Sequence, residues 1–263
     1  MNSYEPALTY SKYLAIEELL RLQKPLSDGP EHDELLFIII HQTYELWFKQ
    51  LLHEIQETQK ALESGDTHYA LALLGRIRTI MKICVSQIDI LETMTPRQFN
   101  SFRSRLDSAS GFQSAQFREF EVILGRRDSK VASHLDPSSR EKVESRMSQN
   151  SLWDSTVKYL FTRGAQLSNE ILNRNVQEGY QPSIEIQRAL LDLHEHDPEA
   201  GLVFERLVDI DEGLQEWRYR HVKMVERTIG NKSGTGGSSG ANYLKSTLFH
   251  PVFPDLWEIR SSF

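Results

Sequence analysis

The sequence predicts an all-α fold, a single domain over residues 1–263 in which long antiparallel helices form a bundle. Apolar residues recur at helical spacings over stretches of roughly 25 to 30 residues, and the prolines fall between these stretches. No segment alternates apolar and polar residues over several pairs, which argues against strands. A chain of 263 residues with 39% hydrophobic side chains can also bury a sizeable core.

Breaks at prolines and glycines separate the first elements. Within residues 1–24, Ser11 or a polar neighbour opens an amphipathic helix over 11–24, which Pro25 ends. A second helix follows Pro30 and continues to Ser64, a length of about 30 residues or roughly 45 to 50 Å at 1.5 Å per residue. A helix of that length spans a whole domain.

The middle of the chain continues the helical pattern with one interruption. Residues 66–92 predict another long helix, antiparallel to the one before it because the connection is short. Residues 97–115 mix arginines with turn-forming residues, so we expect a functional loop there in place of a continuous core helix. A charged connector is expected over 126–137, and further helices over 116–124, 138–148, 150–177, 183–195 and 199–229.

A glycine- and serine-rich tract follows the last long helix. Residues 230–240 hold five of the 14 glycines of the chain. Such tracts are commonly flexible linkers, but only 23 residues follow this one. A loop folded over a site is therefore the competing interpretation.

Charge and composition exclude several classes of protein. Thirty Lys and Arg against 37 Asp and Glu give a net charge of −7, which provides no positive field for nucleic acid. No unbroken apolar run exceeds six residues, whereas a membrane span needs about 20, and no signal sequence precedes the first helix. The single cysteine, Cys84, lies in an apolar stretch and is expected to be a buried thiol, which fits a cytoplasmic protein.

Two histidines lie within apolar helical stripes. His41 shares a helix face with Phe37 and Tyr44, and His221 shares one with Leu214 and Trp217. Each alone is adequately explained as a core histidine with one hydrogen-bond partner. Two such histidines on different helices of a bundle favour an interior site, and His221 also lies shortly before the glycine-rich tract. A haem with one axial imidazole fits such a site.

Other metal and nucleophile patterns are weaker. A di-iron bundle needs Glu-x-x-His on two helices, and no histidine here has an acidic residue three positions before it. Residues 194–196, His-Glu-His, resemble a polar helix end. Residues 236–240 match Gly-x-Ser-x-Gly, but a hydrolase elbow needs a preceding strand, and a long helix precedes this segment.

Two polar residues are candidates for binding a small ligand. Arg103 lies close to Phe99 beside a Ser/Gly turn, where a shielded guanidinium can clamp a carboxylate through two hydrogen bonds. A solvated surface arginine is the alternative. Thr235, in the glycine-rich tract, offers a hydroxyl to the polar end of a ligand.

Four longer motifs in the same order carry a family resemblance. They are FIIIHQTYELWF at 37–48, SASGFQS at 108–114, WRYRHV at 217–222 and GTGGSSG at 234–240. With them, the sequence resembles the tryptophan 2,3-dioxygenases over nearly its whole length. The resemblance implies a helical enzyme with one haem b per subunit, ferrous when active, that inserts O2 across the indole C2–C3 bond of L-tryptophan. The product is N-formyl-L-kynurenine, the first intermediate of tryptophan catabolism.

The resemblance also implies roles for individual residues. His221 would be the iron ligand, Arg103 would bind the substrate carboxylate, and His41 would accept a hydrogen bond from the indole N–H. Thr235 would bind the ammonium or carboxylate end, and Phe37 and Phe99 would wall the indole pocket. Tyr10 and Tyr13 would complete the pocket of a neighbouring subunit in a homotetramer built as a dimer of dimers.

Two other classes of function remain open at this point. A haem-binding sensor or carrier would keep the helices and the pocket without the chemistry. A purely helical interaction protein would use the long amphipathic helices alone.

Overall fold

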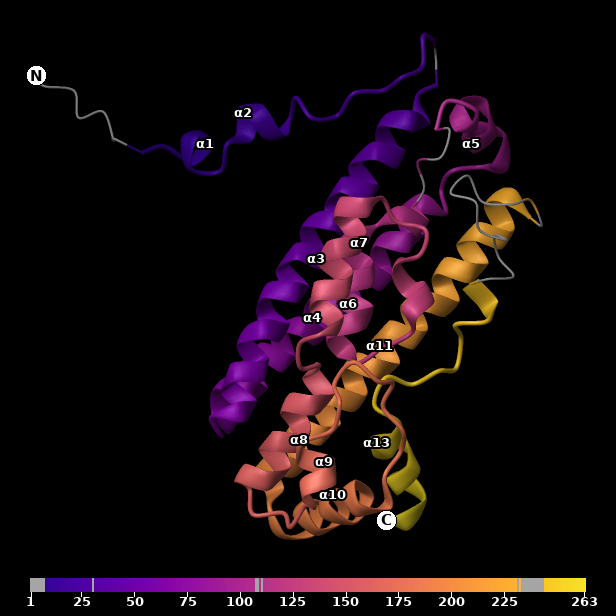
Figure 1. The fold of residues 1–263 in the computed structure, drawn as a ribbon. Helices are drawn as coiled ribbons and strands as arrows, with labels where there is room; N and C mark the ends of the chain where they lie inside the picture. Colours follow the sequence, from indigo (N-terminus) through magenta and orange to yellow (C-terminus); the bar gives the residue numbers. More distant parts are fainter. Residues whose placement is uncertain (1–7, 30, 107–108, 110, 231, 233–243) are drawn as a thin grey trace, which may run out of the picture.

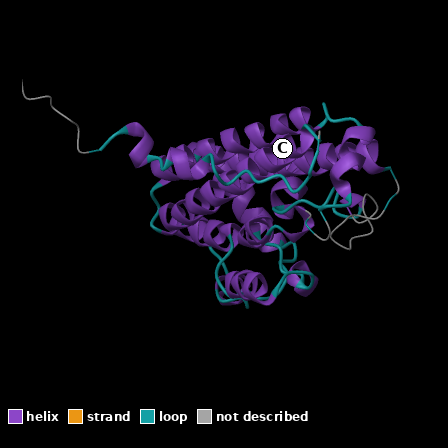
Figure 2. Ribbon diagram, turned by 90° about the horizontal axis from the view of Figure 1, so that it is seen from above, coloured by secondary structure: helices purple, strands orange, loops and turns teal. Residues whose placement is uncertain are grey.

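The computed structural model describes residues 8–29, 31–106, 109, 111–230, 232 and 244–263. Within these ranges every regular element is a helix, and Figure 2 shows no strand in the described part of the chain. The predicted all-α class is therefore confirmed.

Three long helices form the frame of the molecule (Figure 1). They are α3 (Asp33–Glu63), α4 (Thr67–Leu91) and α11 (Pro198–Ile229), and α4 packs against both of the others. All three were expected at these places. Asp66 caps α4 by accepting a hydrogen bond from the Tyr69 N–H at 3.1 Å, and Asp197 caps α11 in the same way through Ala200 at 3.1 Å.

Shorter helices surround this frame. Three match their expected positions, namely α6 (Ala115–Leu124), α7 (Pro137–Met147) and α10 (Ile184–His196). The prediction of a single helix over 150–177 is wrong. Instead, α8 (Leu152–Thr162) ends before Gly164, whose φ of +97° lies outside the helical region. Only a short turn of helix, α9 (Asn169–Leu172), follows it, and α13 (Pro254–Glu258) lies near the C-terminus.

The N-terminal segment also differs from the prediction. Instead of one helix over 11–24, the chain forms α1 (Tyr10–Tyr13) and α2 (Ile16–Leu19), interrupted at Ala15 by a φ of 48°. Neither helix buries a residue, and the segment extends away from the body of the molecule (Figure 1). Helices this short need packing to be stable, and the described part of the chain buries none of their residues.

Part of the loop expected over 97–115 is helical. A capping box formed by Thr95 and Gln98, with Pro96 in the first turn, begins α5 (Pro96–Arg103). A single turn of 3₁₀ helix, η1 (Gly111–Gln113), lies further along the segment. Another such turn, η2 (Ser129–Ala132), interrupts the connector before α7.

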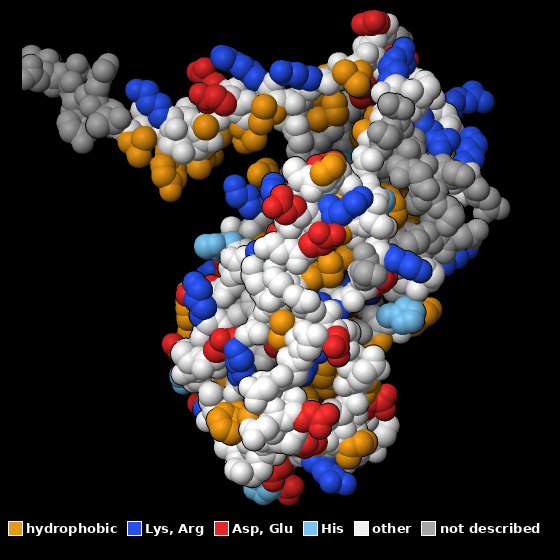
Figure 3. Space-filling model, viewed as in Figure 1, with side chains coloured by type: hydrophobic (Ala, Val, Ile, Leu, Met, Phe, Trp, Pro, Cys, Tyr) orange, Lys and Arg blue, Asp and Glu red, His pale blue; other side chains and the backbone are white. Residues whose placement is uncertain are grey.

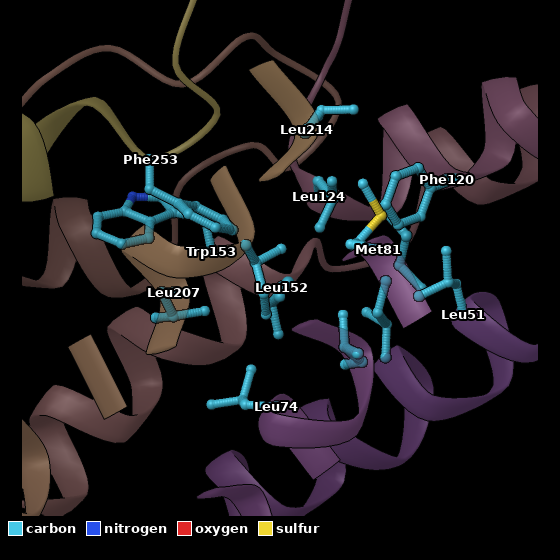
Figure 4. Packing of buried hydrophobic residues seen from close by; sticks show 14 of the residues in the cluster. Leu51, Leu74, Met81, Phe120, Leu124, Leu152, Trp153, Leu207, Leu214 and Phe253 are labelled. Carbon is cyan, nitrogen blue, oxygen red and sulfur yellow. The ribbon is translucent and has the colours of Figure 1, made fainter. Parts of the chain in front are cut away.

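The hydrophobic core follows the three long helices and continues to the C-terminal segment. Figure 4 shows buried side chains from distant parts of the chain meeting in it, among them Leu51, Leu74, Phe120 and Phe253. Cys84 belongs to this core, so the predicted buried thiol is confirmed, and burial raises its pKa to about 12. A second, smaller cluster lies under α7 and contains Val122, Val131, Ala132, Leu135 and Val143.

No helix in the described ranges has the length and apolar character needed to cross a bilayer.

Candidate active site

A cavity of about 210 Å³ opens between α3, α5, η1, α6 and α11. A second cavity, beside α8 and α9, measures about 40 Å³. One water needs roughly 10 to 15 Å³ on this measure, so the larger cavity has room for a ligand. Its walls include both histidines singled out from the sequence, together with Phe37, Phe99 and Arg103.

His41 faces this cavity from α3 with a defined tautomer. Its Nδ1 atom lies 2.7 Å from the carbonyl oxygen of Phe37, one turn earlier on the helix. A carbonyl oxygen only accepts, so Nδ1 carries the proton and Nε2 is left as an acceptor when the ring is neutral. Burial lowers the pKa of His41, against the opposing effects of the Phe37 carbonyl and of the Glu45 charge. The ring is therefore neutral at physiological pH.

His221 reaches the cavity from α11. Its ring stacks on that of Trp217, with centroids 4.9 Å apart and planes 15° from parallel. Burial, reinforced by the nearby His41 and Arg118, lowers the pKa of His221 to about 4. A neutral imidazole in an apolar wall has the lone pair that a transition metal requires.

Two aromatic rings, those of Phe37 and Phe99, and the guanidinium of Arg103 form another part of the cavity wall. The Phe37 ring centroid lies 5.9 Å from that of Phe99 and 5.7 Å from that of Phe102. Arg103 is the last residue of α5 and lines the same cavity. The arrangement offers flat apolar surfaces and a guanidinium, which suits an aromatic ligand bearing a carboxylate.

A buried charge cluster forms another part of the cavity wall. Glu121 accepts hydrogen bonds from Arg118 at 2.6 Å and from Arg218 at 3.0 Å, and Arg126 reaches it at 3.1 Å. Burial alone would raise the pKa of Glu121, but the three guanidinium groups outweigh it and lower the pKa. The Nε atoms of Arg118 and Arg218 have no partner among the described residues. The lining of the cavity here thus contains two guanidinium groups and one carboxylate, a surplus of positive charge.

The structure does not bring every predicted residue to this cavity. Tyr10 and Tyr13 do not line the cavity but lie on α1, where they are 76% and 73% exposed. Figure 3 shows hydrophobic side chains along the lower side of this N-terminal segment. Thr235 lies outside the described residues.

The base of the N-terminal segment is attached beside His41. The Gln42 amide donates to the carbonyl oxygen of Leu22 at 3.2 Å. The buried carboxylate of Glu34 accepts from the backbone N–H groups of Leu26 and Ser27 at 2.7 and 3.0 Å. These contacts hold the end of the segment at the start of α3.

Sequence reasoning missed the charge cluster. Arg118 and Glu121 are three residues apart on a predicted helix, a spacing that brings their side chains together. No sequence pattern showed that Arg218, 97 residues later, would meet them. Among the described residues, the His-Glu-His segment included, no cluster of three or more His, Cys, Asp or Glu side chains is placed to hold a metal ion.

Comparisons with known proteins place the sequence in a family. The sequence model of the family described as tryptophan 2,3-dioxygenase matches residues 1–145 and 201–263. The chain is 54% identical to the tryptophan 2,3-dioxygenase of Anaeromyxobacter dehalogenans, over 99% of this chain and 98% of that protein. It is 54% identical to that of Herpetosiphon aurantiacus and 43% identical to that of Caulobacter vibrioides, in each case over 97% of this chain and 98% of the relative. The chain therefore belongs to the tryptophan 2,3-dioxygenase family.

Proposed function

We propose that this chain is a haem-dependent tryptophan 2,3-dioxygenase with one catalytic domain. It inserts both atoms of O2 across the C2–C3 bond of the indole ring of L-tryptophan and forms N-formyl-L-kynurenine. The observation that carries the proposal is the placement of two neutral histidines, His41 and His221, on one aromatic cavity in a member of this family.

The cavity residues suit a haem group. His221 would bind the haem iron, since its ring lines the cavity, is neutral and is held by stacking on Trp217. Arg118 and Arg218 would bind the propionates, because each lines the cavity and carries a positive charge. When bound, ferrous haem supplies the iron that binds and activates O2.

The remaining residues would bind and orient the amino acid. Arg103 would hold its carboxylate bidentately, and Phe37 and Phe99 would lie along the indole ring. The Nε2 atom of His41 would accept a hydrogen bond from the indole N–H. This bond would fix the ring and stabilise positive charge as it develops there. Thr235 is assigned to the ammonium or carboxylate end by the family resemblance alone.

A homotetramer is part of the proposal, because the N-terminal segment needs a partner. Tyr10 and Tyr13 are exposed on helices that bury nothing in their own chain. Packing on a neighbouring subunit would cover them and let them complete that subunit's pocket. We place the protein in the cytoplasm, in keeping with its lone buried thiol.

Spectra of the reduced protein, recorded without and then with O2 and with or without L-tryptophan, test this function. A five-coordinate ferrous haem spectrum, followed by steady growth of the formylkynurenine absorbance, is the expected result. Haem binding without product would favour a sensor or carrier. Colourless protein that cannot be reconstituted with haemin would overturn the proposal.

A further inference from the structure

His134 lies outside the cavity but holds a residue that lines it. The residue follows η2, and its Nε2 atom lies 2.7 Å from the carbonyl oxygen of Phe112. The two rings are stacked, with centroids 3.8 Å apart and planes 25° from parallel. Because a carbonyl oxygen only accepts, Nε2 carries a proton and donates it to this hydrogen bond.

A second group holds the same residue. The guanidinium of Arg118 lies 5.2 Å from the centroid of the Phe112 ring, within the range of a cation–π contact. Its Nη2 atom also reaches the Phe112 carbonyl oxygen, at 3.5 Å. Arg118 is itself fixed by Glu121, so Phe112 is held from two separate parts of the chain.

Phe112 belongs to the turn η1, which lies against His41. A Cβ atom placed on Gly111 would come within 3.9 Å of both Nε2 and Cδ2 of the His41 ring. The Ser114 N–H closes the turn by donating to the Gly111 carbonyl oxygen at 3.1 Å. Any displacement of Phe112 therefore moves the backbone that adjoins the Nε2 edge of His41.

We propose that His134 is a positioning residue that fixes the turn Gly111–Gln113 over the Nε2 edge of His41. The inference rests on the proposed function, because His41 Nε2 matters only if it accepts the indole N–H. His134 has two holding contacts, a hydrogen bond and a ring stack. The hydrogen bond sets the position of the backbone directly, since its acceptor is the main-chain carbonyl of Phe112.

Three substitutions separate these contacts. His134→Gln keeps a side-chain N–H donor without the ring, His134→Phe keeps the ring without the donor, and His134→Ala removes both. His196→Ala is the matched control, because His196 is an exposed histidine that pairs only locally, with Asp192.

Hydrogen exchange followed by mass spectrometry tests the holding role on the protein as purified, with no need for turnover. We expect amides of residues 111–118 to exchange about tenfold faster in His134→Ala and His134→Phe, and near the native rate in His134→Gln. Peptides from α3 and α4 should be unchanged in all variants. Unchanged exchange at 111–118, or faster exchange throughout the chain, would overturn the proposal.

A double-mutant comparison tests whether the effect reaches catalysis through His41. His134→Ala should lower kcat/KM for L-tryptophan about tenfold in the native background and less than twofold in a His41→Ala background. Equal losses in both backgrounds would contradict action through His41. Absence of tryptophan turnover in the native protein would refute the proposed function instead, and the exchange result would still decide whether His134 holds the turn.

Discussion

The Nδ1 atom of His41 lies 2.7 Å from the carbonyl oxygen of Phe37, and this contact determines which ring nitrogen is available to a ligand. Because the carbonyl holds the proton on Nδ1, the neutral ring offers only Nε2, and only as an acceptor. The helix that presents the histidine thus also selects its tautomer. An indole N–H is a donor that needs such an acceptor.

Replacing His41 by Ala should lower kcat/KM for L-tryptophan by about 10- to 100-fold, because the indole N–H would lose its partner in a buried site. The informative substrate is 1-methyl-L-tryptophan, which has no indole N–H. The native protein should prefer L-tryptophan over it strongly, and His41→Ala should lose most of that preference. A variant that keeps the full preference would show that the N–H is recognised elsewhere.

Replacing Arg103 by Ala should raise KM for L-tryptophan by about 30- to 1000-fold, since a charge-assisted pair worth roughly 2 to 4 kcal/mol is lost. Tryptamine, which lacks the carboxylate, should be affected far less. Arg103→Lys keeps the charge without the planar fork, so its KM for L-tryptophan should lie between those of the native protein and Arg103→Ala. If Arg103→Ala still prefers L-tryptophan over tryptamine as strongly as the native protein does, the carboxylate is bound by another group.

Replacing His221 by Ala should abolish the five-coordinate ferrous haem spectrum, because the cavity would lose the imidazole that we propose as the iron ligand. The measurement is haem content per chain together with the Soret band of the reduced protein. His194→Ala is a suitable control, since His194 is a half-buried helix histidine that packs on Phe204 and Phe263 away from the cavity. Full haem content and activity in His221→Ala would refute the ligand assignment.

Local sequence signals predicted most of the fold. The positions of α3, α4 and α11 followed from apolar spacing and from the breaks between the apolar stretches, which are local signals. The prediction of one N-terminal helix was wrong for a tertiary reason, because the described part of the chain does not bury its apolar face. Apolar spacing shows that a face needs covering but does not show what covers it.

The site was predictable only where its residues share a helix or a family motif. His41 and His221 could be singled out on their own helices, and the cavity does include both. The meeting of Glu121 with Arg218, and of His134 with Phe112, depends on how distant segments pack. Neither pair has a local spacing that would have revealed it.

Replacing Glu121 by Gln should destabilise the protein at pH 7 by about 3 kcal/mol, because Arg118 and Arg218 would lose the buried carboxylate that pairs with both. The folded-state pKa of Glu121 lies below its ordinary value of 4.5, so the carboxylate contributes stability above that pH. The contribution is lost as the pH falls from 4.5 through the folded-state pKa. Urea unfolding should therefore show the difference between native protein and Glu121→Gln shrinking below pH 4.5. A difference that is constant with pH would contradict this account.

Asp211 should be among the most sensitive positions for stability, because it anchors the C-terminal segment to α11. Its fully buried carboxylate accepts from the backbone N–H groups of Val252 and Phe253 at 3.0 Å each and from the Trp257 indole N–H at 2.9 Å. Asp211→Ala leaves these donors without an acceptor, and we expect a loss of about 3 kcal/mol in the free energy of unfolding. Asp192→Ala, at an exposed position on α10, should change it by less than about 0.5 kcal/mol. Equal midpoints of urea unfolding for the two variants would mean that the segment is held by its apolar contacts alone.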